Sequence, residues 1–134
     1  MARRAEPDVL AAIAVGGALG TLARYEVGQA IHVAKDTFPW PTFIVNVSGA
    51  FVLGAFLTVV LTRHPPARYA RAFFAIGFLG SFTTFSTMAV ETVTLVKDHK
   101  AALGIGYLLV SVAVGLVVCW LGNRVARLTW SRPC

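Results

Sequence analysis

The chain has 134 residues, of which 57% are hydrophobic and 13% are charged, and its formal net charge is +6. This composition excludes an ordinary soluble domain, in which about a quarter of the residues are charged. A basic balance would indicate nucleic-acid binding in a soluble protein. Here the basic residues fall between long apolar runs, so we expect them to set membrane topology and we expect no nucleic-acid partner.

Four apolar segments follow one another along the chain, at approximately residues 9–33, 40–62, 70–97 and 101–123. Each reaches the roughly 20 residues that a helix needs to cross a bilayer. The sequence therefore predicts an all-α integral membrane protein, with a single membrane domain of four transmembrane helices. The first segment contains Arg24 and Glu26 and leads into further spans, which does not fit a cleavable signal peptide.

The charges between the spans differ in number on the two sides of the membrane. Four spans place both termini and the middle loop on one side, which carries eight arginines, whereas the other side carries three lysines. Under the positive-inside rule, this count predicts cytoplasmic termini. We expect a multi-pass protein of the inner (plasma) membrane.

The first segment has a face of small residues. Gly16, Gly20, Arg24 and Gly28 recur every four residues, which places them on one side of a helix. Small residues at this spacing let a second helix approach closely, so the glycines predict a packing seam. A guanidinium within a span costs roughly 2.5 to 3.5 kcal/mol on insertion scales. Arg24 therefore either snorkels to the interface or has a structural or anion-facing role.

Polar side chains are rare in the other spans. Asn46 is the only amide in the middle of a span, and it either bonds a neighbouring helix or donates to a permeating anion. Tyr107 and Ser111 form a thin polar stripe, although a serine in a membrane helix commonly bonds the carbonyl four residues before it. Glu91 lies deep enough in its span to need a partner or water.

The third segment contains the least typical stretch, GFLGSFTTFSTM, which runs from Gly77 to Met88. It holds two glycines, five hydroxyl residues and three aromatic residues without a charge. Irregular backbone inside a bilayer is tolerated only where it is buried in protein or lines a wet cavity. We therefore predict that the third helix is broken in mid-membrane, where it unwinds from Gly80 to Thr83.

A break at this place predicts an ion site. Carbonyls at the end of the first half carry the negative end of a helix dipole and suit a desolvated cation. The hydroxyl of Thr83 or Thr84 can cap the second half. Beyond the break, the positive edge of the Phe85 ring can face an anion, with hydroxyl donors nearby. The sequence contains no Ser/His/Asp set, phosphate loop or Cys/His cluster, so we do not expect an enzyme.

Taken together, these motifs resemble the CrcB/Fluc fluoride channel family. The resemblance rests on the glycine-rich face that ends in Arg24-Tyr25, the run NVSGAF from Asn46, the run GFLGSFTTFST from Gly77, Glu91, and the Tyr107/Ser111 stripe. It covers essentially all four spans, in order. It implies a fluoride-selective channel that passively exports fluoride to lower its cytoplasmic level, assembled as an antiparallel, dual-topology homodimer with two pores.

The resemblance also implies roles for particular residues. It implies a structural sodium ion at the dimer centre, held by the backbone carbonyls of Gly80 and Thr83, and it implies fluoride, a second copy of the chain and the lipid bilayer as partners. Arg24 and Glu91 take structural or electrostatic roles. The implied fluoride pore residues are Asn46, Phe85, Ser86, Thr87, Met88, Tyr107 and Ser111.

Two residues depart from the family pattern. Met88 stands where the family has a second pore phenylalanine, and its thioether cannot offer the same positive ring edge. Gly115 stands where the fourth-helix track usually has a third serine. The basic bias also conflicts with dual topology, so either the chain inserts both ways despite the bias or a homologous chain supplies the opposite orientation.

Two other functions compete with the channel. A small dual-topology exporter of drugs or other cations usually needs a midspan carboxylate in the first helix, whereas Glu26 lies towards the end of its span and beside Arg24. A membrane scaffold without transport would need only the glycine seams. A scaffold function would not explain the amide of Asn46 or the hydroxyl-rich stretch in the third segment.

Overall fold

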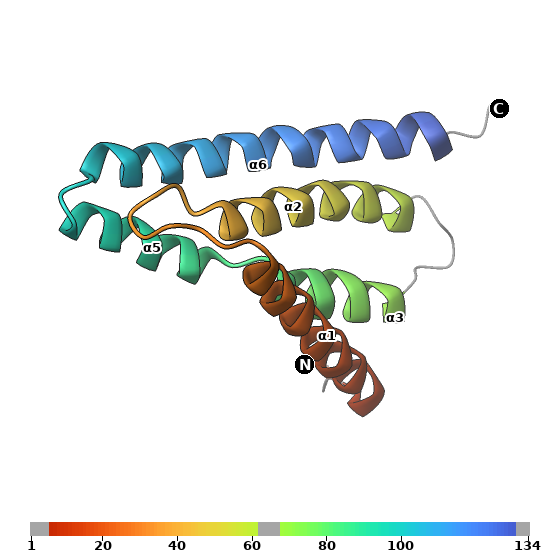
Figure 1. Cartoon of the computed structure of the whole chain (residues 1–134). Helices are drawn as coiled ribbons and strands as arrows, with labels where there is room; N and C mark the ends of the chain where they lie inside the picture. Colours follow the sequence, from red (N-terminus) through yellow and green to blue (C-terminus); the bar gives the residue numbers. More distant parts are fainter. Residues whose placement is uncertain (1–5, 62–67, 131–134) are drawn as a thin grey trace, which may run out of the picture.

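The computed structural model of the protein describes residues 6–61 and 68–130, and within these ranges its regular secondary structure is entirely helical (Figure 1). The described elements, in chain order, are α1 (Pro7–Ala30), α2 (Trp40–Leu61), α3 (Arg68–Ala70), the π-helix η1 (Arg71–Leu79), α4 (Gly80–Phe82), α5 (Phe85–Lys97) and α6 (Ala101–Trp130). Four helical segments are long and apolar enough to cross a membrane, which confirms the predicted number of spans.

The first and last spans end at places that differ from the expected ones. α1 stops at Ala30 because Ile31 adopts an extended conformation, with φ −108° and ψ 95°. α6 continues to Trp130, well beyond residue 123. Its 30 residues measure about 45 Å at 1.5 Å per residue, which exceeds the roughly 30 Å of a hydrocarbon core. Part of α6 therefore extends beyond the acyl chains.

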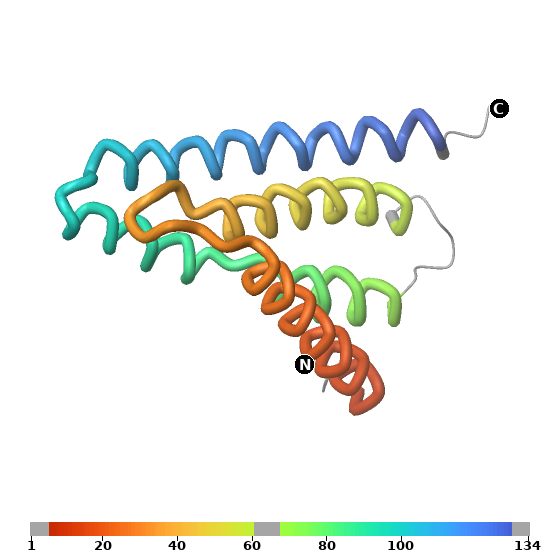
Figure 2. The backbone as a smooth tube through the Cα atoms, viewed as in Figure 1, coloured from red at the N-terminus to blue at the C-terminus, as the bar shows by residue number. Residues whose placement is uncertain are grey.

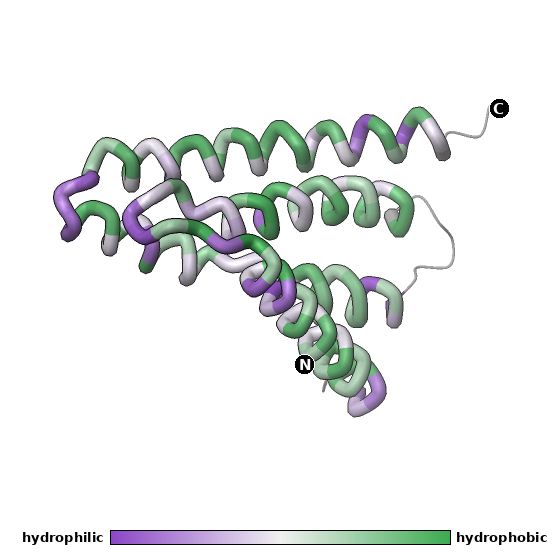
Figure 3. The backbone as a smooth tube through the Cα atoms, viewed as in Figure 1, coloured by the Kyte–Doolittle hydropathy of each residue, from purple (hydrophilic) through white to green (hydrophobic). Residues whose placement is uncertain are grey.

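The helices form a bundle from which α1 projects. α2 and α6 lie side by side and run in the same direction, and α5 packs against α6 (Figure 1). α1 crosses η1 and α4 obliquely, with one end pointing away from the other helices (Figure 1). This arrangement leaves many apolar side chains exposed, where lipid or another chain can cover them. Figure 3 shows that hydrophobic residues make up most of each long helix.

Glycines allow the close contacts in this bundle. A Cβ at Gly16 or Gly20 would collide with the carbonyl oxygen of Phe73 or Phe78, so the predicted seam of α1 packs directly on the backbone of η1. Gly28 is not part of the seam, because a Cβ added there would have no atom of another helix within 4 Å. Similar contacts join α2 to α6, where Gly54 meets the backbone of Cys119 and Gly122 meets that of Phe51.

The third span has a more irregular backbone than the other spans. It opens with η1, in which the amide of Gly80 reaches the carbonyl of Ala75 five residues before it. π-Helices are rare and often lie at functional sites. Further along, Thr83 (φ −74°, ψ 154°) and Thr84 (φ −146°, ψ 119°) are extended. Figure 2 shows the tube straightening between the two coiled parts of this span.

The extended residues lie later than we expected. Gly80 to Phe82, which we expected to unwind, form the short helix α4, and only Thr83 and Thr84 leave helical geometry before α5 begins at Phe85. The reason is tertiary, because a side chain of α2 binds the backbone of Thr84, as described below.

The seam of α1 can be tested with a pair of glycine variants. Gly20→Val is expected to destabilise the protein by about 1 to 3 kcal/mol, because the added carbons overlap the backbone at Phe78. The midpoint of thermal unfolding in a mild detergent reports this loss. Gly28→Val is the matched control and is expected to unfold like the wild type. Equal losses in the two variants would contradict the seam.

Candidate functional site

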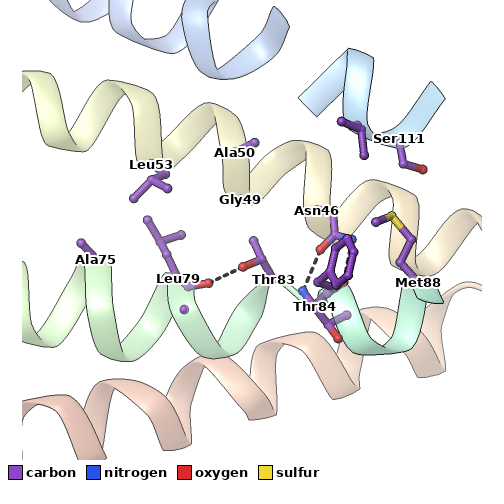
Figure 4. A pocket seen from close by; sticks show the side chains of 13 residues that line it. Asn46, Gly49, Ala50, Leu53, Ala75, Leu79, Thr83, Thr84, Met88 and Ser111 are labelled. Atoms are coloured by element: carbon purple, nitrogen blue, oxygen red, sulfur yellow. Dashed lines mark hydrogen bonds between the residues drawn. The ribbon is translucent and has the colours of Figure 1, made fainter. Parts of the chain in front are cut away.

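A groove of about 330 Å³ lies where α2, the α4–α5 junction and α6 meet (Figure 4). We call it the central groove. It brings together six residues that the sequence predicted to contact an ion, and these come from three spans. They are Asn46, Gly80, Thr83, Phe85, Met88 and Ser111. The other lining residues are Gly49, Ala50, Leu53, Ala75, Leu79, Thr84 and Val112.

Asn46 binds both backbone groups of Thr84. Its Nδ2 donates to the Thr84 carbonyl at 2.9 Å, and its Oδ1 accepts from the Thr84 amide at 2.8 Å (Figure 4). An extended residue has no helical partners for these groups, and leaving them unpaired in an apolar surrounding would be costly. Of the two roles left open for Asn46, the structure supports the bond to a neighbouring helix. One hydrogen of Nδ2 serves the Thr84 carbonyl, and the amide carries a second one.

The close approach of α2 to this junction depends on Gly49. A Cβ at this position would collide with Cγ2 of Thr83, which lies one residue before the residue that Asn46 binds. Asn46 and Gly49 share one face of α2 because they are three residues apart. The spacing in the sequence therefore places the Asn46 side chain on the same face as the glycine that lets α2 approach the junction.

Thr84 also begins α5. Its Oγ1 accepts a hydrogen bond from the amide of Thr87 at 3.1 Å, as the predicted cap requires. The same oxygen lies 2.9 Å from Oγ1 of Thr87 and 3.3 Å from Oγ of Ser86. Ser86 and Thr87 are exposed and do not line the central groove. They form a hydroxyl cluster with Thr84 at the start of α5.

Two carbonyls lose their usual helical donors at this junction. In a continuous helix the amide of Thr84 would bond the carbonyl of Gly80, and the amide of Thr87 would bond that of Thr83. Here these amides bond Asn46 Oδ1 and Thr84 Oγ1 instead. Gly80 and Thr83 both line the central groove, and carbonyl oxygens are ligands that hard cations prefer. Two carbonyls from one chain make only part of a coordination shell.

Phe85 and Met88 differ strongly in exposure. The Phe85 side chain is 71% exposed, whereas Met88 is 4% exposed and points towards Ser111 of α6 (Figure 4). The ring of Phe85 is thus accessible at the mouth of the groove, and the thioether of Met88 fills its inner side.

Ser111 has a buried hydroxyl group without a hydrogen-bond partner in the described part of the chain. The bond to the carbonyl four residues earlier, which is common for serine in membrane helices, is not formed. By contrast, Thr58 and Thr92 form such bonds at 2.8 Å. Ser111 lines the central groove, and its hydroxyl keeps a hydrogen-bonding capacity that no described residue uses.

Glu91 has two hydroxyl partners. Tyr107 of α6 donates to Oε2 at 2.7 Å, and Thr42 of α2 donates to Oε1 at 2.8 Å. Tyr107 is only 1% exposed and does not line the central groove, unlike Ser111, with which we grouped it. Thr42 was missed by the sequence reasoning, although it lies four residues before Asn46 and so on the same face of α2.

A second groove of about 280 Å³ lies beside the Glu91 carboxylate. It contains the two charged residues for which the sequence predicted a structural or electrostatic role. Arg24 and Glu91 line it together, with the hydroxyl residues Thr42, Thr84 and Thr87. This position favours a structural or anion-facing role for Arg24 over snorkelling. Because Thr84 lines both grooves, the charged one adjoins the central one.

Comparison with known proteins places the chain in a family. A family model described as "CrcB-like protein, Camphor Resistance (CrcB)" matches residues 11–123. The chain belongs to the CrcB family. The chain is also similar to "Fluoride-specific ion channel FluC 1" of Mycolicibacterium paratuberculosis, with 45% identity over 118 residues that cover 88% of this chain and 89% of that protein.

Two further relatives of this CrcB-family chain carry similar names. "Fluoride-specific ion channel FluC 3" of Streptomyces avermitilis is 46% identical over 129 residues, which are 96% of this chain but 63% of that longer protein. "Fluoride-specific ion channel FluC" of Solibacter usitatus is 40% identical over 116 residues, covering 86% of this chain and 95% of that protein. The family resemblance inferred from the motifs is thereby confirmed.

Removing the amide of Asn46 tests the role of this side chain at the junction. Asn46→Ala is expected to destabilise the protein by at least about 1 to 3 kcal/mol, because the amide and carbonyl of Thr84 both lose their partner. Amide hydrogen exchange is expected to quicken at Thr84 and in the first turn of α5. Ser48→Ala is the control, because Ser48 Oγ donates to carbonyls of its own helix and, among the described residues, to no other segment. Unchanged exchange in Asn46→Ala would contradict the proposed role.

Proposed function

We propose that this chain forms a passive fluoride channel in the plasma membrane and lowers cytoplasmic fluoride. Membership of the CrcB family and the names of its relatives support this function. The observation that carries it furthest is the central groove, which is lined both by Ser111, whose buried hydroxyl has no partner among the described residues, and by the exposed ring of Phe85. Both groups can replace part of the water around a small anion.

The groups in the central groove suit passage more than tight binding. The Ser111 hydroxyl, the second hydrogen of Asn46 Nδ2 and the edge of the Phe85 ring are neutral donors. The residues that line this groove carry no charge. An ion that meets only weak neutral contacts can leave as well as enter. The adjoining groove contains Arg24, which would offer a positive charge to an anion, although Glu91 lines the same groove. Thr84, which belongs to the hydroxyl cluster, lines both grooves.

The proposed channel is an antiparallel, dual-topology homodimer with two pores. The exposed Phe85 ring and the open central groove are consistent with a second chain at this face. The released carbonyls of Gly80 and Thr83 would hold sodium at the dimer centre, together with the same pair from the second chain. Sodium, when bound there, would supply a positive charge at the interface. A homologous chain in the opposite orientation would supply the second pair of carbonyls in the same way.

The alternative function is a small exporter of drugs or other cations. Its usual requirement is a midspan carboxylate in the first helix. Glu26 of α1 is exposed and lines neither groove, and Glu91 accepts hydrogen bonds from Tyr107 and Thr42. These positions favour the channel over the exporter.

Fluoride efflux from proteoliposomes, recorded with a fluoride electrode, tests the channel directly. The purified chain is expected to release fluoride quickly and to exclude chloride almost completely. Phe85→Ile is expected to reduce fluoride flux by at least about tenfold, because the ring edge is lost where the groove opens.

Phe78→Ile is the matched control for this measurement. Phe78 stacks with Phe74 and Phe82 and does not line the central groove, so its loss is expected to leave most of the flux. Equal effects of the two substitutions would show that the Phe85 ring does not have a specific role in the fluoride pore. Efflux that requires a proton gradient would instead favour the exporter.

Dual topology can be tested with one introduced cysteine. Ala70→Cys, in a chain with serine at positions 119 and 134, places a thiol at an exposed position at the start of the third span. In sealed vesicles that conduct fluoride, a membrane-impermeant maleimide is expected to label about half of the chains from outside and the rest after permeabilisation. Labelling from one side alone, in a homogeneous and active preparation, would rule out dual topology.

A further inference from the structure

A third groove, of about 950 Å³, lies between α2 and α6 near the C-terminal end of α6. We call it the basic groove. It is separate from the two grooves described above, with which it shares no lining residue. Its lining residues are Gly54, Leu57, Thr58, Leu116, Cys119, Trp120, Asn123, Arg124 and Arg127.

The basic groove has an apolar part and a cationic part. Leu57 and Leu116 provide hydrocarbon at one end, and the neighbouring outer surface of α6 is also apolar. At the other end lie Arg124 and Arg127, one turn apart on the same helix. Figure 3 shows two hydrophilic bands close to the C-terminal end of α6, after a long hydrophobic stretch. No acidic residue is among the residues that line this groove.

Trp120 lies between the two parts. The Arg124 guanidinium lies 5.0 Å from the centre of the Trp120 ring, which holds the arginine over an aromatic surface. Tryptophan is enriched at the boundary between acyl chains and headgroups. The change from apolar to cationic walls therefore coincides with a residue that is typical of the membrane interface.

The length of α6 independently places Trp120 at the membrane interface. From Ala101, about 20 residues of helix are needed to cross the roughly 30 Å of hydrocarbon, which brings the interface close to Trp120. Arg124 and Arg127 follow one and two turns later, at the depth of lipid phosphates. An apolar wall at acyl-chain depth and two cations at phosphate depth match the two parts of a phospholipid.

We propose that the basic groove binds one anionic phospholipid from the adjacent leaflet. Its phosphate accepts hydrogen bonds from Arg124 and Arg127, and an acyl chain lies along Leu116 and Leu57. Basic pockets between transmembrane helices are suited to anionic headgroups. A small inorganic anion would leave the apolar part of this large groove empty, which favours a lipid. The proposal does not depend on fluoride transport.

Quenching of tryptophan fluorescence tests this proposal. The full chain with Trp40→Phe and Trp130→Phe keeps Trp120 as its one tryptophan. It is reconstituted in phosphatidylcholine vesicles that contain a small fraction of dibrominated phosphatidylglycerol or, in parallel, of dibrominated phosphatidylcholine. We expect phosphatidylglycerol to be enriched beside Trp120, by roughly fivefold for each arginine.

Substitutions at the arginines separate charge from packing. Arg124→Gln is expected to lower the enrichment about fivefold, the double change to glutamine at 124 and 127 is expected to abolish it, and Arg124→Lys is expected to retain it. Arg71→Gln, which alters an exposed arginine outside the groove, is the matched control and should change nothing. The midpoint of thermal unfolding in a mild detergent shows whether each variant is folded.

Three results would overturn the proposal. Equal quenching by the two brominated lipids would show that the groove has no preference for anionic headgroups. Absence of quenching by either lipid would show that a second copy of the chain or another protein surface covers Trp120. Enrichment that persists in the double glutamine variant would assign it to another part of the protein.

Discussion

The two hydrogen bonds between Asn46 and the backbone of Thr84 are the interaction on which the rest of the site depends. Backbone inside a bilayer can leave helical geometry only where its polar groups find other partners. A single carboxamide meets this need, because it offers one donor and one acceptor at the separation of a peptide group. Without it, the simplest way to satisfy Thr84 would be a continuous helix, in which the carbonyl of Gly80 would be occupied.

The consequences of this interaction extend along the third span. Because the Thr84 backbone is held by α2, the Thr84 side chain is free to cap α5. α5 therefore starts at Phe85, which brings Phe85 to the mouth of the central groove and Met88 to its inner side. Thr84 also lines the charged groove next to Arg24. One residue thus connects a groove whose lining residues carry no charge with a groove that contains Arg24 and Glu91.

Local sequence patterns were sufficient to predict the four spans, the seam of Gly16 and Gly20, and the cap at the start of α5, because each depends on composition or on helical spacing. They were not sufficient for the π-helix η1 or for the exact extended residues. The position of the extended residues depends on which amide a side chain of α2 binds, here Asn46 at Thr84. Periodicity could group Tyr107 with Ser111, but only tertiary packing shows that Tyr107 reaches Glu91 whereas Ser111 remains without a partner in the described part of the chain.

The extended pair Thr83 and Thr84 also changes the geometry of the span as a whole. An extended residue advances the chain by about 3.3 Å and a helical one by about 1.5 Å, so this pair lengthens the path by about 4 Å. It also resets the rotational phase between α4 and α5. Residues four apart across the junction, such as Phe82 and Ser86, do not share a face, although a single helical wheel would place them together. The third span therefore presents two independently oriented faces, and each must be matched to its neighbours separately.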